Sequence, residues 1–211
     1  MDIDATSRKA AGYLRTRLAL TSDDEAVLVY SIQMIISGMV SLVAIIIMAW
    51  FLGVLKLALA SVVTAATMRT FSGGAHSERV FNCAALGVLI TPGIALLVKY
   101  RLTDIPGDRL FWFYVLTAIT AIAAVIKYAP ADTPAKPITN PAHRKRLREI
   151  SLGLIGIWLV LIVVILGREN TGYFPYLTAS ALSLIWQSFS ITTAGYRAMA
   201  GFDRLMPKGR P

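Results

Sequence analysis

A cysteine and a histidine lie seven residues apart in one short polar stretch of this chain, SGGAHSERVFNC, which runs from Ser72 to Cys83. Cys83 is the only cysteine of the sequence, and His76 is one of its two histidines. A cysteine attacks carbonyl carbons as the thiolate, and free cysteine has a pKa of about 8.5, so a base must assist it at neutral pH. An adjacent imidazole does this by forming a thiolate–imidazolium pair. The two residues are therefore candidates for nucleophilic catalysis.

The spacing of the pair restricts how the two side chains can meet. In an unbroken helix, seven residues correspond to about 10.5 Å of rise, too far for proton transfer. The pairing therefore requires His76 to be non-helical. Gly73-Gly74, directly before it, give the backbone the freedom to leave the helical conformation. The packing alternative is equally physical, because a lone cysteine near a membrane helix end commonly serves as a small apolar residue.

The cap of the following helix decides how its dipole acts on the cysteine. If Asn82 is the N-cap, Cys83 lies in the first turn, where the dipole favours a thiolate. If Ser77 is the cap, Cys83 lies in the second turn and the effect is weak. Two histidines and one cysteine are too few for a metal site, and we expect neither a metal nor another cofactor.

The elements that carry these residues are membrane helices. Of the 211 residues, 56% are hydrophobic and 16% are charged, against about 25% charged in soluble domains. Runs of about 20 apolar residues span a bilayer. The sequence predicts a single-domain, all-α, polytopic membrane bundle over residues 1–211, with about six transmembrane helices. Its apolar segments are Ala26–Leu52, Val54–Met68, Val80–Val98, Leu110–Ile126, Ile150–Leu166 and Tyr173–Thr193.

The second segment is short for a span, because 15 residues reach only about 22 Å. Its pairs of small residues, such as Ser61 with Ala65, allow close helix contact and favour an interior position. In the last segment, Ser183, Gln187 and Ser190 share one helix face. That polar stripe either lines a substrate groove or hydrogen-bonds a neighbouring helix, and its place in the membrane directs it inward.

The distribution of Lys and Arg predicts the orientation. With six spans and a cytoplasmic N-terminus, the cytoplasmic segments hold sixteen of the 21 basic residues, and the other side holds five. This bias places both termini and the polar stretch at the cytoplasmic face of the membrane. The net charge of +9 reflects the same bias, and we expect no nucleic-acid partner. Residues 1–25 do not form a cleavable signal peptide; they are either an amphipathic helix on the lipid surface or a solvated basic leader.

Two blocks of the sequence resemble the accessory gene regulator B (AgrB) family of membrane cysteine endopeptidases. The first is RTFSGGAHSERVFNC, with Arg69, Gly73, Gly74, His76 and Cys83. The second is YAPADTPAKPITNPAHRKRLRE, which resembles the family's Ala-Pro-x-Asp…Lys-Pro segment followed by basic residues. The order of the blocks and the number of spans also fit, so the resemblance covers nearly the whole chain.

The resemblance implies that Cys83 is the nucleophile and His76 the general base in cleavage of a quorum-sensing propeptide. An acyl-enzyme would form, and the C-terminal fragment would leave. Ring closure to a thiolactone or lactone and simple hydrolysis both remain open. The expected partners are a small AgrD-like propeptide and membrane lipid, and a homodimer is open. The alternative from another class is a non-catalytic transporter or peptide exporter. An ion-coupled carrier would need ionisable residues in mid-span, and the six segments lack them.

The remaining candidate residues concern the oxyanion and the substrate. Arg69 is a candidate donor to the oxyanion or to a substrate carboxylate, and equally an orientation anchor. The backbone N–H groups around Gly73 and Gly74 are rival oxyanion donors. The basic loop 127–149, which its prolines keep non-helical until about residue 142, is a candidate cradle for the acidic tail of a propeptide. Its candidate binding residues are Arg144, Lys145, Arg146 and Arg148.

Overall fold

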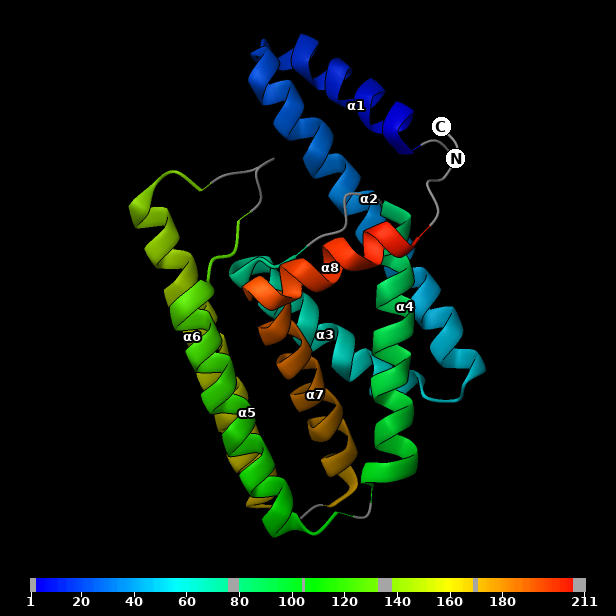
Figure 1. Ribbon diagram of the computed structural model, residues 1–211, viewed down its shortest axis with the longest axis vertical. Coiled ribbons are helices and arrows are strands. Elements are labelled where there is room, and N and C mark those ends of the chain that lie inside the picture. The colour runs from blue at the N-terminus through cyan, green and yellow to red at the C-terminus, as the bar shows by residue number, and fades with distance from the viewer. Residues whose placement is uncertain (1–2, 76–79, 104, 133–137, 169–170, 207–211) are drawn as a thin grey trace.

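Helices make up nearly all of the protein, as the apolar segments predict. The computed structural model describes residues 3–75, 80–103, 105–132, 138–168 and 171–206, and these ranges contain no β-strand (Figure 1). The all-α fold is therefore confirmed. The helices are α1 (Ile3–Leu18), α2 (Ser22–Phe51), α3 (Leu55–Ser72), α4 (Val80–Leu97), α5 (Gly107–Tyr128), α6 (Pro141–Leu166), α7 (Phe174–Ser190) and α8 (Thr193–Leu205), with a π-helical turn at Val98–Leu102 and a 3-10 turn at Thr171–Tyr173.

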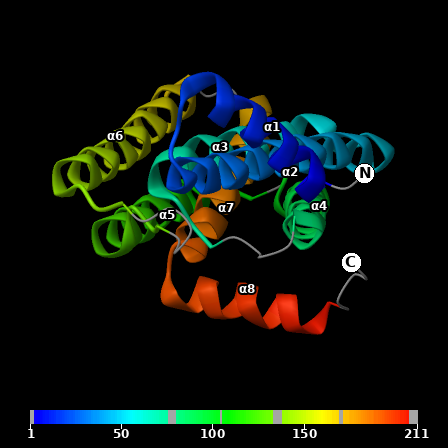
Figure 2. The same ribbon diagram turned by 90° about the horizontal axis from the view of Figure 1, so that it is seen from above.

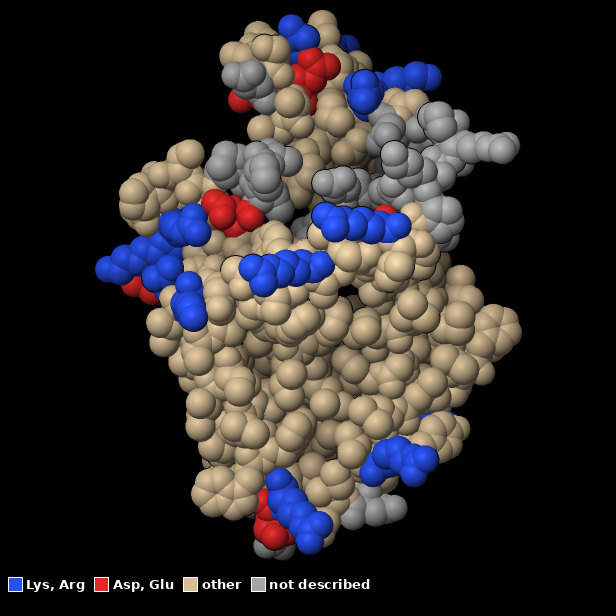
Figure 3. All heavy atoms as spheres, viewed as in Figure 1, with Lys and Arg blue, Asp and Glu red and all other residues tan. Residues whose placement is uncertain are grey.

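Four of the described helical stretches are long and apolar enough to cross a membrane. They are Asp24–Phe51, Asn82–Leu102, Gly107–Tyr128 and Pro141–Leu166. In the space-filling view a broad uncharged belt separates the charged side chains at the two ends of the molecule (Figure 3). The other two expected spans form α3 and α7, which fall outside this set of four. Helix α7 has only 17 residues, and α3 contains Lys56 and Arg69 together with several hydroxyl side chains.

The short helix α3 nevertheless connects the two ends of the bundle. At its start, the Lys99 Nζ donates to the Gly53 carbonyl at 3.2 Å, so the α2–α3 turn lies beside the end of α4. At its other end, Gly73 pairs with Ala131 just after α5. The expectation that this segment packs inside the protein holds for one face only, because Ala58, Ser61 and Met68 are buried whereas Leu59 and Val63 are exposed.

Hydroxyl groups join α3 to α7 along the middle of the bundle. The Ser61 Oγ donates to the Ala179 carbonyl at 3.2 Å, and the Ser183 Oγ donates to the Ser61 carbonyl at 2.7 Å. The Thr64 and Ser180 hydroxyls lie 2.7 Å apart. Small side chains let the two backbones approach closely enough for these bonds, as is usual between membrane helices.

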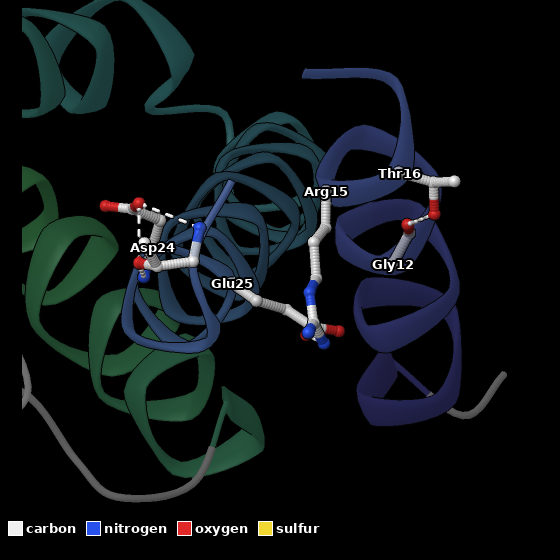
Figure 4. A network of polar contacts seen from close by, with 6 residues as sticks. Gly12, Arg15, Thr16, Asp24 and Glu25 are labelled. Carbon is white, nitrogen blue, oxygen red and sulfur yellow. Dashed lines mark hydrogen bonds and ion pairs between the residues drawn. The ribbon is translucent and has the colours of Figure 1, made fainter. Parts of the chain in front are cut away.

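The N-terminal segment forms α1, which folds back against α2. Ser7 and Ala11 are buried in their contact, and an ion pair of 2.6 Å joins Arg15 to Glu25 (Figure 4). Thr21 caps α2 in a reciprocal capping box with Asp24. The expected N-terminal helix is thus present, and one side of it packs on the protein.

The last helix, α8, lies across one end of the bundle, near the starts of α4 and α6 (Figure 2). Thr192 caps it by accepting from the Gly195 N–H at 3.1 Å. Gly195 lies so close to the Phe189 carbonyl that a side chain there would collide with it. The last apolar segment predicted from the sequence ends at Thr193, and α8 was not predicted.

The basic loop is shorter than residues 127–149. Helix α5 continues to Tyr128, and α6 begins at Pro141 behind the Asn140 cap. The start of α6 agrees with the prediction of non-helical chain to about residue 142. The basic stretch His143–Arg148 consequently forms the first turns of a helix.

We predict that Ser183→Val destabilises the protein, because the branched side chain removes the hydrogen bond to Ser61 and crowds α3. The cost is about 1 kcal/mol, and the midpoint of thermal unfolding in detergent falls by roughly 3 °C. Thr120→Val is the matched control, because the exposed Thr120 hydroxyl bonds only to carbonyls of its own helix. Equal unfolding midpoints for the two variants would show that the hydrogen bond between Ser183 and Ser61 does not stabilise the protein.

Candidate functional site

Cys83 lies in the first described turn of α4 and is half-buried. Its side chain lines a cavity of about 430 Å³. Arg69 at the end of α3 lines the same cavity and interacts electrostatically with Cys83. The cavity is bounded by α2, α3, α4, α7 and α8, and most of its lining is apolar. The thiol therefore borders a partly open, largely apolar space and also has a guanidinium group nearby.

Asn82 is tied to the C-terminal helix. Its Nδ2 donates to Asp203 Oδ1 of α8 at 2.8 Å, and Asn82 is 3% exposed. Because Asn82 lies inside α4, the interpretation of this residue as the N-cap is wrong. The bond fixes the start of α4, and with it the backbone of Cys83, to α8. His76 and Ser77 lie outside the described residues, so the proposed pairing of His76 with Cys83 is untested.

The glycine pair connects the two sequence blocks. Gly73 and Ala131 form a parallel bridge, in which the Ala131 N–H donates to the Ser72 carbonyl at 2.8 Å. The Gly74 N–H donates to the Ala131 carbonyl at 3.3 Å, and the Gly73 N–H to the Arg69 carbonyl at 3.0 Å. Both glycine N–H groups therefore hold segments together, and an oxyanion role would require one of these bonds to open.

Gly73 and Gly74 are required by backbone geometry. Their φ angles are +70° and +144°, which L-residues with side chains rarely adopt. A Cβ on Gly73 would collide with the Ala131 carbonyl, and one on Gly74 would lie 2.8 Å from the Ser190 Oγ. The freedom that the sequence predicted at these positions is used to pack the chain against two neighbours.

The polar stripe of α7 forms hydrogen bonds to neighbouring segments, and two of its residues also line the cavity beside Cys83. The Gln187 Nε2 donates to the Gly73 carbonyl at 2.8 Å and to the Ser72 Oγ at 3.1 Å. Gln187 and Ser190 also line the cavity beside Cys83. Ser183, one turn earlier, bonds only across to α3 among the described contacts.

Ala75 is fixed at the edge of the cavity. Its N–H donates to the Ser190 carbonyl at 3.0 Å, and its own carbonyl accepts a hydrogen bond from Arg69 Nη2. Ala75 is 1% exposed. It is the last described residue before His76 in the sequence, so α3 and α7 together fix the point from which the histidine segment continues.

Two of the four candidate substrate-binding residues hold the segment that follows α5. Arg148 Nε donates to the Ala129 carbonyl at 2.9 Å, and Arg144 Nη2 donates to the Pro130 carbonyl at 3.2 Å. Arg144 also pairs with Asp132 at 3.2 Å. A hydrogen bond from the Ile138 N–H, together with the charge of Arg144, lowers the pKa of Asp132, which therefore stays ionised at neutral pH.

The other two basic candidates face outward. Lys145 and Arg146 are exposed, and Lys145 lies 3.8 Å from Glu149 one turn away. Figure 3 shows basic side chains gathered at this corner of the molecule. The four residues therefore divide into an inner pair that stabilises the protein and an outer pair that an acidic partner can reach.

Sequence reasoning missed the residues of α8 that complete the site. Tyr196 donates to the Asp132 carbonyl at 3.1 Å, Met199 lines the cavity, and Asp203 accepts from Asn82. The three positions share one helical face, since they are three and four residues apart. This spacing of three and four residues could have been recognised in the sequence directly after the last apolar segment.

The comparisons with known proteins agree with the resemblance of the two blocks. The family model "Accessory gene regulator B" matches residues 7–191. An AgrB-like protein 2 of Clostridium perfringens (strain 13 / Type A) is 27% identical over 98% of this chain and 99% of its own length. An AgrB-like protein of Listeria innocua serovar 6a is 30% identical over 44% of this chain and 45% of its own. No solved structure gives a significant match.

We predict that Gly73→Ala disrupts the junction with Ala131. The backbone conformation alone costs about 1–3 kcal/mol for a residue with a side chain, and the collision adds to it. The midpoint of thermal unfolding falls by roughly 5 °C or more. Gly156→Ala on α6 is the control, because a Cβ there meets no atom within 4 Å. An unchanged midpoint for Gly73→Ala would show that the junction is not required.

Proposed function

The chain belongs to the accessory gene regulator B family, and we propose that it is a membrane-embedded cysteine endopeptidase that cleaves a small propeptide. Cys83 is the nucleophile in this proposal, and His76 is the general base. The observation that carries it is the place of Cys83, which lines one cavity together with Arg69 at the end of the bundle where Ala75 is held.

The reaction begins when the imidazole of His76 accepts the proton of the Cys83 thiol. The sulfur attacks the carbonyl carbon of the scissile peptide bond, and the carbonyl oxygen takes the negative charge. When the C–N bond breaks, the imidazolium returns the proton to the leaving amine, and the N-terminal part of the peptide remains as a thioester. A water molecule, or a thiol or hydroxyl of the substrate, then takes the acyl group.

Arg69 supports this chemistry in two ways. Its hydrogen bond to the Ala75 carbonyl holds the segment that leads to His76. Its position on the cavity wall with Cys83 suits it to balance negative charge on the oxyanion or on a substrate carboxylate. The bond between Asn82 and Asp203 makes Asp203 a positioning residue, because it acts on Cys83 through the start of α4.

The outer basic pair is the proposed contact for the acidic tail of the propeptide. Lys145 and Arg146 project from the first turns of α6, at the same end of the bundle as Cys83 (Figures 1 and 3). This assignment narrows the basic cradle from four residues to two, since Arg144 and Arg148 bond to the chain itself. The active site and the tail contact would both lie at the cytoplasmic face.

We predict that Cys83→Ala abolishes cleavage and that His76→Ala lowers its rate by about 10²–10⁴ fold, the range expected for a general base. The measurement is mass spectrometry of membranes in which the protein is co-expressed with each short peptide encoded beside its gene. In the unaltered protein a brief reaction adds the mass of the N-terminal fragment, and neutral hydroxylamine releases it as expected for a thioester.

His143→Ala is the control for this experiment, because it removes the other histidine, which is exposed on α6. Full cleavage by Cys83→Ala or by His76→Ala, with normal insertion, would refute the peptidase proposal. Intact peptide that crosses the membrane without cleavage would instead support the exporter alternative.

We also predict that Lys145→Glu with Arg146→Glu raises the KM for the propeptide on the order of tenfold and leaves kcat unchanged. Exposed ion pairs contribute roughly 0.2–1 kcal/mol each, and reversal adds repulsion. The effect shrinks at high salt because such charges are screened. Arg168→Glu, beyond the other end of α6, is the matched control and leaves KM unchanged. An unchanged KM in the double variant would remove the outer pair from substrate binding.

A further inference from the structure

The cavity beside Cys83 extends well beyond the cysteine. On α4 its lining runs from Cys83 through Leu86 and Gly87 to Thr91, which corresponds to about 12 Å of helix. On α3 it runs from Arg69 back to Val62. Among the described residues that line it, Arg69 is the one that carries a charge. The space is therefore polar near the sulfur and apolar farther into the bundle.

Gly38 on α2 lies about level with the sulfur. A Cβ on Gly87 would lie 2.7 Å from the Ser41 Oγ, so α2 and α4 are nearly in contact there. Both helices run downward in Figure 1. About one turn before this contact, α4 holds Cys83 and α2 holds Ser37 and Gly38, so these residues lie at about the same level of the bundle. All five of these residues, Ser37, Gly38, Ser41, Cys83 and Gly87, border the cavity.

The two glycines of this cavity have different surroundings. Gly87 is required by the close approach of α2, as its contact with Ser41 shows. A Cβ on Gly38 would meet no atom within 4 Å. Gly38 is exposed and lines the cavity, so a side chain at this position would enter open space on the cavity wall at about the level of Cys83. A glycine within a helix costs up to about 1 kcal/mol relative to alanine.

We propose that this cavity binds the side chain of the substrate residue whose carbonyl carbon Cys83 attacks, that this side chain is large and apolar, and that Gly38 sets the size of the pocket. The inference rests on the proposed peptidase function and adds to it the class of residue at the cleavage site. A volume of about 430 Å³ lies within the range of roughly 300–1,000 Å³ of ordinary ligand pockets. It accommodates one or two such side chains.

The direction of the peptide follows from the charges. The acidic tail leaves with the C-terminal fragment, and its proposed contacts, Lys145 and Arg146, lie on α6. Helices α2 and α4 bound one side of the cavity, and both views place these helices across the bundle from α6 (Figures 1 and 2). A peptide that passes Cys83 with its tail toward α6 has its N-terminal side at the cavity. The substrate residue whose carbonyl carbon becomes bound to the Cys83 sulfur is therefore the one whose side chain enters the cavity.

The test measures how fast Cys83 of the full-length protein in nanodiscs is alkylated by N-acetyl-aminoacyl acyloxymethyl ketones. These reagents carry an Ala, Leu or Phe side chain next to the ketone that imitates the scissile carbonyl. The sulfur forms a thioether as a carboxylate leaves, and intact mass counts the product on the single cysteine. The unaltered protein reacts at least about tenfold faster with the Leu and Phe reagents than with the Ala reagent, as expected for a side-chain pocket.

Gly38→Leu fills the pocket, so the rates with the Leu and Phe reagents fall to about the rate with the Ala reagent. Gly38→Ala gives an intermediate preference. Gly156→Leu on α6 adds the same side chain to a membrane helix at a site with no neighbour within 4 Å, and it retains the full preference. This control also corrects for partition of apolar reagents into the bilayer.

Equal rates for all three reagents in the unaltered protein would overturn the proposal, as would equal slowing of all three by Gly38→Leu. The first result is expected if a lipid chain occupies the cavity, and the second if the variant merely blocks the thiol. Cleavage of the propeptide is a separate readout. Cleavage that requires Cys83, without side-chain preference, would leave the peptidase function standing and remove the pocket.

Discussion

The structure depends on a short backbone junction between Ser72–Gly74 and Ala129–Asp132. The ends of helices leave N–H and C=O groups without partners, and near a membrane interior such groups are costly to bury. Here the end of α3 and the chain after α5 satisfy one another through Ala131. Only a residue without a side chain permits this approach at Gly73, where φ is +70°. The junction fixes three helix ends at once, because Arg148 ties the start of α6 to the same segment.

The candidate site is built on this junction. Ala75 follows the glycine pair and is held by Arg69 and Ser190, so the chain leaves α3 and α7 at a defined point. It resumes in α4, whose start is tied to α8 by the bond between Asn82 and Asp203. In the proposed mechanism, Cys83 would need a fixed position relative to its base and substrate. The protein achieves this with bonds from four helices that are far apart in sequence.

Small and hydroxyl residues have two opposite uses in the bundle. Between α3 and α7, Ser61 and Ser183 bring two backbones into contact through interhelical hydrogen bonds. Between α2 and α4, Gly38 leaves a cavity beside the thiol. The first arrangement allows α3 and α7, which are less apolar than the other spans, to pack against each other inside the bundle. The second leaves a largely apolar space, which is the proposed pocket for a peptide side chain.

The sequence by itself determined the helical membrane class, most helix positions, the inward direction of the α7 stripe and the need for flexible glycines before His76. These features follow from runs of apolar residues, prolines and helical periodicity, which act along one segment at a time. The tertiary structure alone decided that Asn82 bonds to Asp203 instead of capping α4, and that Arg144 and Arg148 bond to the chain itself. It also decided that a cavity opens beside Cys83. These features depend on the register between helices from distant parts of the chain, and local periodicity carries no information about that register.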